Sequence, residues 1–472
     1  MLDVVSKKLE ENVECLYSLF PKDSCSDFVL DRFNVNGREA CICFFNGLTD
    51  SDLLLRVQDS IMNFSANGNF SKMSEFSQKC IPLTDKKLQS DFKQLTTALL
   101  SAMSLFFIDG YDHAVILDTK SYPSRSIEEP EKNKTMRGPR DGFCESVFIN
   151  TALIRRRIKS SDLAIESFCL GRETQTKVVL VYMRSKAEKR IIEEIRRRLN
   201  SLDINSLTLS QQTLTDHIFE RKLGDKINPF PKVRYIERPD TAASMLIEGK
   251  IGILCDTTPT SIFFPVTLYD MVEETDDYYF PSLTASYLRI LRVVMLFVSV
   301  FLSPLWLLAT VYGEYLPPQL EFLLVDSHAY VPIWLQLIIV EIMMDDLKIA
   351  SLNTPNTISN SLSVVSGLLL SDFAVTAGWL VPQTILYSAI SSIANFIPTN
   401  YELGYAFKFW RIALIVSTAL FAVYGFVFST ALFVVILILN RTSCNREFLY
   451  PFSPKDSKGI LKLFIKTPKG KE

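Results

Sequence analysis

The stretch VVMLFVSVFLSPLWLLATV at residues 293–311 contains nineteen residues and no charge. A helix needs about 20 apolar residues to cross roughly 30 Å of hydrocarbon, so this stretch predicts a membrane-spanning helix. Arg289 and Arg292 come just before it, whereas residues 312–331 contain acidic side chains but no lysine or arginine. Because basic flanks stay in the cytoplasm, the long region before the stretch is predicted to be cytoplasmic.

Two further apolar segments lie towards the carboxyl end. Residues 412–439 contain no charge over 28 positions, with Arg411 and Arg441 on either side. Such a run predicts a second span that crosses with tilt. Residues 361–395 contain Asp372 as their single charge and are interrupted near Pro382, so we interpret them as two short spans joined by a tight turn.

Residues 332–351 have a different pattern. Their first half is apolar, and then Glu341, Asp345 and Lys348 recur at i, i+4 and i+7, which places them on one helical face. We therefore expect an amphipathic helix that is either interfacial or packed inside an assembly. Four spans plus this helix keep both ends of the chain in the cytoplasm, in agreement with the basic tail from residue 441.

Charge divides the chain of 472 residues into three parts. Residues 1–287 contain 37 basic residues (Lys and Arg) and 41 acidic ones (Asp and Glu). Residues 288–440 contain 5 basic and 8 acidic residues, and residues 441–472 contain 8 basic and 3 acidic ones. A net charge of −2 lacks the basic surface that phosphate binding needs, which argues against a nucleic-acid partner. The charged first twenty residues contain no apolar run, so no signal peptide is expected.

The polar half contains alternating strand and helix signals. An apolar strand at 40–45 precedes a helix at 51–64, and the same order recurs with a strand at 177–183 and a helix at 187–199. Further strands are expected at 206–209, 251–255 and 261–266. The predicted fold is an α/β cytosolic region of two subdomains followed by an all-α transmembrane bundle. Its predicted divisions are residues 1–120, 121–285 with a linker, 286–441 for the transmembrane helical domain, and 442–472 for the basic cytosolic tail.

Motifs of enzyme chemistry are missing from the sequence. It contains no phosphate-binding glycine loop, no dinucleotide-binding glycine pattern, no His-Glu-x-x-His and no Gly-x-Ser-x-Gly. The nine cysteines are scattered without zinc-knuckle spacing, so we interpret them as reduced, mostly buried side chains. The sequence therefore predicts a protein that is not an enzyme and uses no cofactor or metal.

Carboxylates within apolar segments are the candidate functional residues of the membrane half. They are costly at membrane depth and usually face a bundle interior or a water path. We select Asp372, Glu341 and Asp345 as candidate pore or gating residues. Small residues around Asp372 would let neighbouring helices approach closely, as in oligomeric membrane proteins.

Two polar blocks stand out in the soluble half. Glycine and proline restrict loop geometry, and paired arginine and aspartate can clamp neighbouring groups. We expect the first block to hold the two subdomains in register through ion pairs of Arg140 with Asp141 or Asp240. The candidate structural or signalling residues are Arg137, Gly138, Pro139, Arg140 and Asp141 in the first block and Glu237, Arg238, Pro239 and Asp240 in the second.

These blocks resemble the A subunit of the GerA-type nutrient germinant receptors of endospore-forming bacteria. The resemblance covers roughly residues 40–455. Its main matches are SYP at 121–123, RGPRDGF at 137–143, NTALIRRRIK at 150–159, ERPD at 237–240 and EGKIGI at 248–253. Asp141 differs from the family, which usually has glutamate there.

The resemblance implies a multi-pass receptor subunit in the spore inner membrane that triggers germination. Its implied partners are a transporter-like B subunit, a C-subunit lipoprotein and further copies of the A subunit. The family's A subunits are thought to form a nutrient-gated channel for monovalent cations. A component of a membrane transporter complex is the alternative, although four dissimilar spans do not supply the inverted repeats expected of one.

Overall fold

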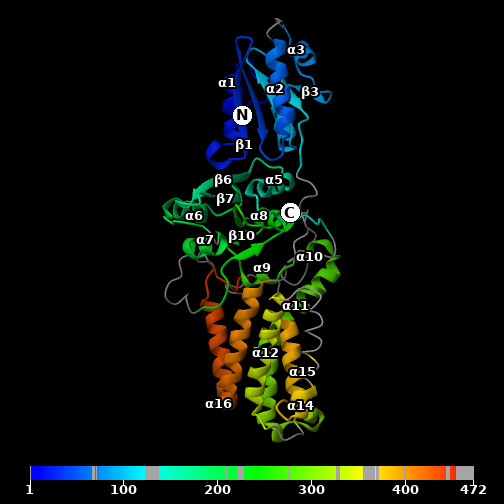
Figure 1. The fold of residues 1–472 in the computed structure, drawn as a ribbon, viewed down its shortest axis with the longest axis vertical. Helices are drawn as coiled ribbons and strands as arrows, with labels where there is room; N and C mark the ends of the chain where they lie inside the picture. Colours follow the sequence, from blue (N-terminus) through cyan, green and yellow to red (C-terminus); the bar gives the residue numbers. More distant parts are fainter. Residues whose placement is uncertain are drawn as a thin grey trace. The chain divides into compact units, whose positions relative to one another are not determined.

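The computed structural model describes residues 2–65, 70, 72–122, 138–207, 210–219, 228–274, 276–325, 330–353, 367, 372–397, 400–442 and 447–452. The chain forms two compact units. Unit 1 consists of Met1–Glu220 and Tyr235–Pro265, and unit 2 consists of Arg221–Arg234 and Val266–Glu472. Figure 1 shows the order of their elements.

The first half of unit 1 is a five-stranded antiparallel sheet, here called sheet 1. Its strand order is β1-β2-β4-β5-β3. The strands are β1 (Phe28–Val35), β2 (Arg38–Phe45), β3 (Lys86–Gln89), β4 (Ser104–Ile108) and β5 (Ala114–Leu117), and the helices are α1 (Leu9–Leu19), α2 (Ser51–Ser65), α3 (Met73–Cys80) and α4 (Phe92–Leu100).

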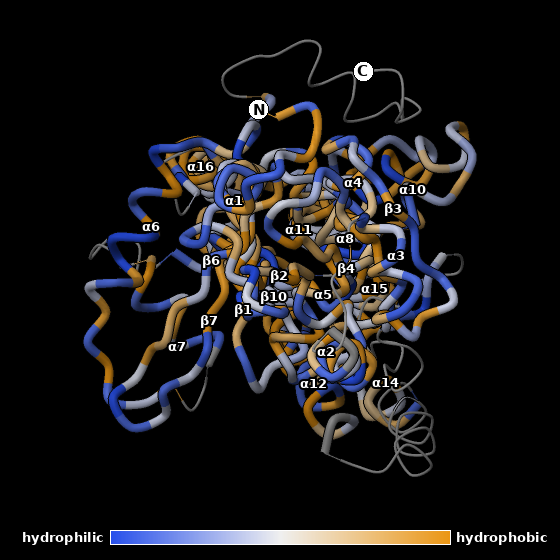
Figure 2. Tube along the Cα trace, turned by 90° about the horizontal axis from the view of Figure 1, so that it is seen from above, coloured by the Kyte–Doolittle hydropathy of each residue, from blue (hydrophilic) through white to orange (hydrophobic). Residues whose placement is uncertain are grey.

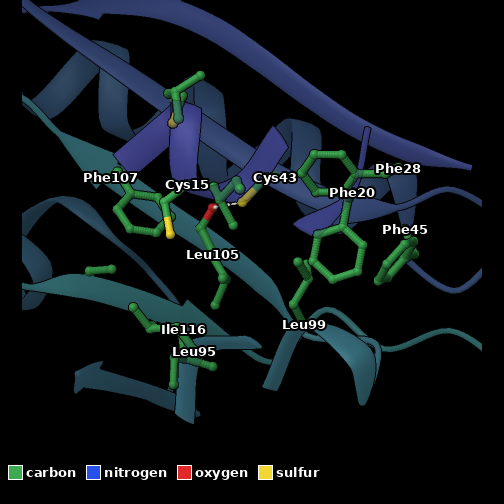
Figure 3. Packing of buried hydrophobic residues seen from close by; sticks show 14 of the residues in the cluster. Cys15, Phe20, Phe28, Cys43, Phe45, Leu95, Leu99, Leu105, Phe107 and Ile116 are labelled. Carbon is green, nitrogen blue, oxygen red and sulfur yellow. Dashed lines mark hydrogen bonds between the residues drawn. The ribbon is translucent and has the colours of Figure 1, made fainter. Parts of the chain in front are cut away.

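Sheet 1 is buried on both faces. Successive side chains of a strand point to opposite faces, so Cys43 and Phe45 of β2 pack with α1 and α4, whereas Ala40 and Ile42 pack with α2 and α3. On the first face the rings of Phe20 and Phe45 lie 5.4 Å apart, and the Cys43 thiol donates to the carbonyl of Leu105 at 3.6 Å (Figure 3). Cysteine therefore serves here as a small apolar side chain, as predicted.

The second half of unit 1 contains sheet 2, with strand order β6-β7-β9-β10-β8. Taken in chain order, the five strands occupy the same positions in both sheets, so the two subdomains share one strand topology. The strands are β6 (Leu163–Leu170), β7 (Thr176–Met183), β8 (Arg234–Ile236), β9 (Ile251–Cys255) and β10 (Ser261–Phe264), and the helices are α5 (Val147–Arg157), α6 (Lys189–Ser201), α7 (Ser210–Ile218) and α8 (Pro239–Ile247).

Unit 2 is helical. Its helices are α9 (Leu268–Val272), α10 (Asp276–Tyr279), α11 (Ser282–Val311), α12 (Ile333–Asn353), α14 (Ala374–Thr376), α15 (Pro382–Asn395) and α16 (Tyr401–Leu439). Within the described residues, α11 and α16 are the helices that are long and apolar enough to cross a membrane. In Figure 2 hydrophobic, orange segments lie near the labels of both helices. The predicted fold, an α/β region of two subdomains followed by a helical membrane region, is confirmed.

α16 is a hairpin of two helices. Ala422 has φ 49° and ψ −128°, which interrupts the helix between residues 401–421 and 423–439. The rings of Phe407 and Phe433 lie 6.1 Å apart, although in one straight helix a rise of 1.5 Å per residue would separate them by about 39 Å. The two halves therefore run side by side (Figure 1). The prediction of one tilted span over residues 412–439 is wrong.

α12 packs within the bundle of its own chain. The predicted helix at 332–351 is confirmed as α12, and its charged face lies against the first half of α16. With 21 residues it is about 30 Å long. Of the two alternatives, an interfacial helix or a packed one, the structure favours the packed helix, because α16 supplies cations for that charged face.

Contacts at the helix ends show how the bundle is ordered. The amide of Leu268, ahead of α11, donates to the carbonyl of Phe448, after α16, at 2.9 Å. At the other end of α11, the indole of Trp306 donates to the carbonyl of Leu323 at 2.9 Å. We call the first end proximal and the second distal. The entry into unit 2 and the described end of the chain therefore lie together at the proximal end.

Candidate functional site

A buried ion cluster joins α12 to the first half of α16. The Arg411 Nη2 atom lies 2.6 Å from Glu341 Oε2, and Lys408 Nζ lies 3.3 Å from the same oxygen. Lys408 Nζ also lies 2.6 Å from Asp345 Oδ2. Two cations therefore neutralise two carboxylates. Glu341 and Asp345, predicted from one helical face, are brought together, whereas the sequence analysis did not select Lys408 and Arg411.

Arg411 also contacts the other two long helices of the bundle. Its Nη1 atom donates to the carbonyl of Ser299 on α11 at 2.5 Å and to that of Ser391 on α15 at 3.3 Å. Next to it, the hydroxyls of Ser303 and Ser391 lie 2.8 Å apart. One guanidinium thus links α11, α12, α15 and α16.

The cluster is almost completely withdrawn from the surface. Glu341 and Arg411 are each 1% exposed. Glu341 lies eight residues from the start of α12, and Arg411 lies ten residues from the start of α16, so both are near mid-helix. Charges at such depth are costly unless they are paired. Removing either partner would leave an uncompensated charge inside the bundle.

The pairing is incomplete. Among the described residues, Glu341 Oε1 and Arg411 Nε have no hydrogen-bond partner. A buried polar atom without a partner costs about 1–3 kcal/mol. The two atoms therefore reduce the stability that the cluster contributes, and buried groups of this kind are uncommon in native structures.

Lys348 extends the charged face of α12 towards the proximal end. Its Nζ atom lies 4.7 Å from the ring centroid of Tyr405, 4.8 Å from that of Tyr401 and 5.1 Å from that of Phe396. Cations are attracted to aromatic faces within about 6 Å. Lys348 therefore joins the end of α12 to the connection between α15 and α16.

Gln336 joins α12 to α15 nearer the distal end. Its Oε1 atom accepts hydrogen bonds from the Val381 amide at 2.9 Å and the Thr384 hydroxyl at 3.1 Å. The amide of Val381 precedes the first turn of α15, where helix donors lack partners within the helix. Gln336 thus caps α15 from a neighbouring helix.

Asp372 lies apart from the ion cluster. It is exposed at the surface of the chain, just before α14, and its carbonyl accepts from the Thr376 hydroxyl at 2.6 Å. The structure therefore separates the candidate carboxylates into Glu341 and Asp345 inside the bundle and Asp372 outside it. Of the small residues predicted around Asp372, Ser363, Ser366 and Ser371 lie outside the described residues, whereas Gly367, Ala374, Ala377 and Gly378 are described.

A second charged cluster lies at the start of α11. Asp277 Oδ2 lies 2.7 Å from Arg292 Nη1 and 3.2 Å from Arg289 Nε, and Glu273 lies 2.7 Å from Arg289 Nη2. Burial raises the pKa of the nearby Glu274 carboxyl, while Arg292 opposes that rise. The two arginines were interpreted as flanks of a span, and the structure shows that they also attach α11 to the segment before it.

The two polar loop blocks of unit 1 contact each other. Arg238 is fully buried, pairs with Asp240 at 2.8 Å and donates to the carbonyl of Pro139 at 2.7 Å. The amide of Phe143 donates to the carbonyl of Glu237 at 2.7 Å. The second block therefore positions the first through backbone carbonyls and one buried arginine.

The predicted role of Arg140 is wrong. Arg140 is exposed, Asp141 pairs with Arg157 at 2.5 Å, and Asp240 pairs with Arg238. Gly138 is exposed with φ 115°, and Arg137 lies outside the described residues. The sequence indicated that arginine and aspartate pair in these blocks. It could not indicate which arginine is buried and paired, because burial depends on the tertiary structure.

A different arginine joins the two subdomains. Arg155 of α5 binds both carboxylate oxygens of Asp27, at 2.8 Å through Nε and 3.0 Å through Nη2. Beside it, the amide of Ser26 donates to the carbonyl of Ile165 in β6 at 2.8 Å. Arg155 stands within the quoted NTALIRRRIK segment but was given no role. A run of three arginines at a helix end gave no signal of which one would be buried.

Comparison with known proteins identifies the family. A family model described as Bacillus/Clostridium GerA spore germination protein matches residues 15–472. This chain belongs to the GerA family. The resemblance stated from the sequence blocks is confirmed. In the described part of this GerA-family chain, no group of three or more His, Cys, Asp or Glu side chains could hold a metal ion.

Several relatives match over nearly the whole chain. Stage V sporulation protein AF of Bacillus subtilis (strain 168) is 27% identical, over 94% of this chain and 89% of the relative. The uncharacterized membrane protein YfkQ of the same organism is 28% identical, over 98% and 90%. Spore germination protein KA, also from that organism, is 27% identical, over 94% and 82%.

A solved structure matches part of the chain. It is the crystal structure of the N-terminal domain of the A subunit of the Bacillus megaterium spore germinant receptor GerK3. Its sequence is 25% identical, the match covers 56% of this chain and 97% of that chain, and the TM-score is 0.44.

Proposed function

We propose that this GerA-family chain is the A-type membrane subunit of a nutrient germinant receptor in the spore inner membrane, and that copies of it assemble into a nutrient-gated path for monovalent cations. Family membership supports the role in spore germination. A transporter-like B subunit and a C-subunit lipoprotein are the proposed partners. The proposed function requires no cofactor.

The separation of the carboxylates supports a path built between chains. Inside one chain Glu341 and Asp345 are neutralised by Lys408 and Arg411, so they do not present free negative charge to a cation. Asp372 is exposed on the outside of the chain. An exposed carboxylate within an apolar segment must be paired or hydrated, and a ring of carboxylates around a shared axis would attract cations together with their water.

The ion cluster is proposed as the gating part of the same assembly. It links four helices through charges that can exchange partners. A change of its pairing would move helices against one another. We therefore assign Asp372 to the permeation path and Glu341 and Asp345 to gating.

Asp372→Asn tests the permeation role, because it keeps the shape of the side chain and removes its charge. Spores carrying this variant should contain normal amounts of subunit and release potassium more slowly after nutrient addition. Asp346→Asn is the matched control, since it removes an exposed carboxylate of α12. Normal release and ion selectivity in the Asp372 variant would remove this residue from the path, and saturable slow flux without channel currents in the purified complex would favour a transporter component.

A further inference from the structure

The facing residues of α12 and the first half of α16 form an antiparallel ladder. Glu341 lies opposite Arg411, Asp345 opposite Lys408, and Lys348 opposite Tyr405. Since the residues on each helix are separated by three or four positions, every rung lies about one helical turn from the next. The ladder fixes the register of the two helices.

Both lysines of this ladder also reach the partner one turn away. Lys408 Nζ lies 2.6 Å from Asp345 and 3.3 Å from Glu341. Lys348 Nζ lies 4.7 Å from the ring of Tyr405 and 4.8 Å from that of Tyr401. Each lysine thus already touches the partner it would have in a second register.

We propose that α12 is a sliding switch that moves along the first half of α16 by one helical turn, about 5.4 Å, towards the carboxyl end of α12. In the shifted register Glu341 lies opposite Lys408, Asp345 opposite the Tyr405 hydroxyl, and Lys348 opposite Tyr401. This inference rests on the proposed function, because the slide is the step that would open the proposed cation path.

The ladder favours this movement in one direction. A slide the opposite way would pair Asp345 with Arg411. It would also put Lys348 against Lys408 and Glu341 against Ile415, which brings two like charges together and leaves a carboxylate in apolar surroundings. Such contacts are strongly unfavourable inside a membrane bundle. The order of charges along the two helices therefore sets the direction of the slide.

Three side chains hold α12 in the present register. Glu341 would give up Arg411, and Asp345 would exchange Lys408 for the Tyr405 hydroxyl. Gln336 would give up the Val381 amide and the Thr384 hydroxyl. Arg411 would keep the carbonyls of Ser299 and Ser391, so α11, α15 and α16 would stay together while α12 moves. The present register is the resting state because the shifted one lacks these contacts.

Paired cysteines in the full-length membrane protein would report the register. Lys348→Cys with Tyr405→Cys reports the present register, and Lys348→Cys with Tyr401→Cys reports the shifted one. Disulfide formation after mild oxidation is measured by mass spectrometry of the cross-linked peptides. Single-cysteine variants control for reaction with the native cysteines, which in the described residues lie outside these helices.

The ratio of the two cross-links is then compared between the wild-type sequence and variants of the ion cluster. Arg411→Gln removes the contact that holds Glu341. The ratio of the shifted cross-link to the present one should therefore rise about tenfold, as expected for the loss of one charged hydrogen bond. Asp345→Asn, at a partly exposed position, should change the ratio in the same direction and replaces the first variant if that one does not accumulate. An unchanged ratio in the variants that accumulate would overturn the switch.

A functional measurement separates this inference from the proposed function. Spores with Arg411→Gln or Asp345→Asn should release potassium without nutrient if the slide opens the path. A changed cross-link ratio with no ion release would support the slide and contradict the proposed channel function. Ion release with an unchanged ratio would contradict the slide and leave the channel proposal standing.

Discussion

At the scale of single residues, burial decides which of several similar side chains matters. Arg155, Arg156 and Arg157 are adjacent, yet Arg155 alone is fully buried and binds Asp27 with two hydrogen bonds. Its guanidinium also lies 4.7 Å from the ring centroid of Phe45. Loss of this side chain would leave the Asp27 carboxylate buried without its partner at the joint between the two sheets.

Arg155→Ala should therefore lower the free energy of unfolding of unit 1 by about 3–5 kcal/mol, the usual cost of breaking a buried ion pair. Pulse proteolysis in urea on the full-length protein in membranes measures this change. Arg140→Ala is the control, and because Arg140 is exposed it should change stability by no more than about 0.5 kcal/mol. Equal effects of the two substitutions would contradict the assignment of Arg155 as the joint.

Cysteine reactivity gives a second prediction at this scale. Burial raises the pKa of Cys41 to about 12, whereas Cys169 is exposed. The thiolate is the reactive form, so iodoacetamide at neutral pH should label Cys169 in the native protein and leave Cys41 unmodified. Peptide mass spectrometry measures both sites, and urea-unfolded protein, in which both should react, is the control. Rapid native labelling of Cys41 would contradict the closed core of sheet 1.

At the scale of elements, the hairpin in α16 depends on close backbone approach. A Cβ atom at Gly425 would overlap the carbonyl oxygen and carbon of Ser417. Ala422 has a positive φ, a conformation that side chains with a Cβ adopt at a cost. The turn therefore needs glycine at one position and carries strain at the other.

Gly425→Ala should force the two halves of α16 apart and sharply lower the amount of protein in the membrane. Ala422→Gly should be tolerated or slightly stabilising, because glycine adopts positive φ without strain. Immunoblots of membrane fractions measure both. Gly367→Ala is the control, since a Cβ there meets nothing within 4 Å. Unchanged levels of Gly425→Ala would indicate that residues 412–439 form a continuous helix after all.

At the scale of the whole molecule, the order of helix ends predicts membrane topology. The segment before α11, the connection between α15 and α16, and the segment after α16 all belong to the proximal end of unit 2. The connection between α11 and α12 belongs to the distal end. That both chain ends lie on the cytoplasmic side stays a prediction, and the number of spans behind it changes.

Epitope tags placed after Phe280, Ile397 and Glu472 should all be accessible from the cytoplasmic side, and a tag after Leu316 should be accessible from the opposite side. Labelling of intact and permeabilised cells measures each position. A tag after Glu472 on the side of Leu316 would mean an odd number of crossings and would contradict the hairpin in α16.

Much of this organisation was determined by the sequence alone. Uncharged runs predict membrane helices because charge is costly in hydrocarbon, and alternating apolar residues predict strands because side chains alternate across a sheet. The loop blocks at 137–143 and 237–240 identified the family. The spacing of Glu341, Asp345 and Lys348 placed them on one face of a helix before any partner was known.

Tertiary structure decided which groups meet. Glu341 and Arg411 are 70 positions apart, and Asp27 and Arg155 are 128 apart, so no local spacing predicts either pair. The turn at Ala422 lies in a long run without charge, where hydropathy cannot distinguish one helix from two. Local patterns specify the elements because they depend on neighbouring residues, whereas pairing and burial depend on long-range packing, which alone determines which charges are removed from solvent and lipid.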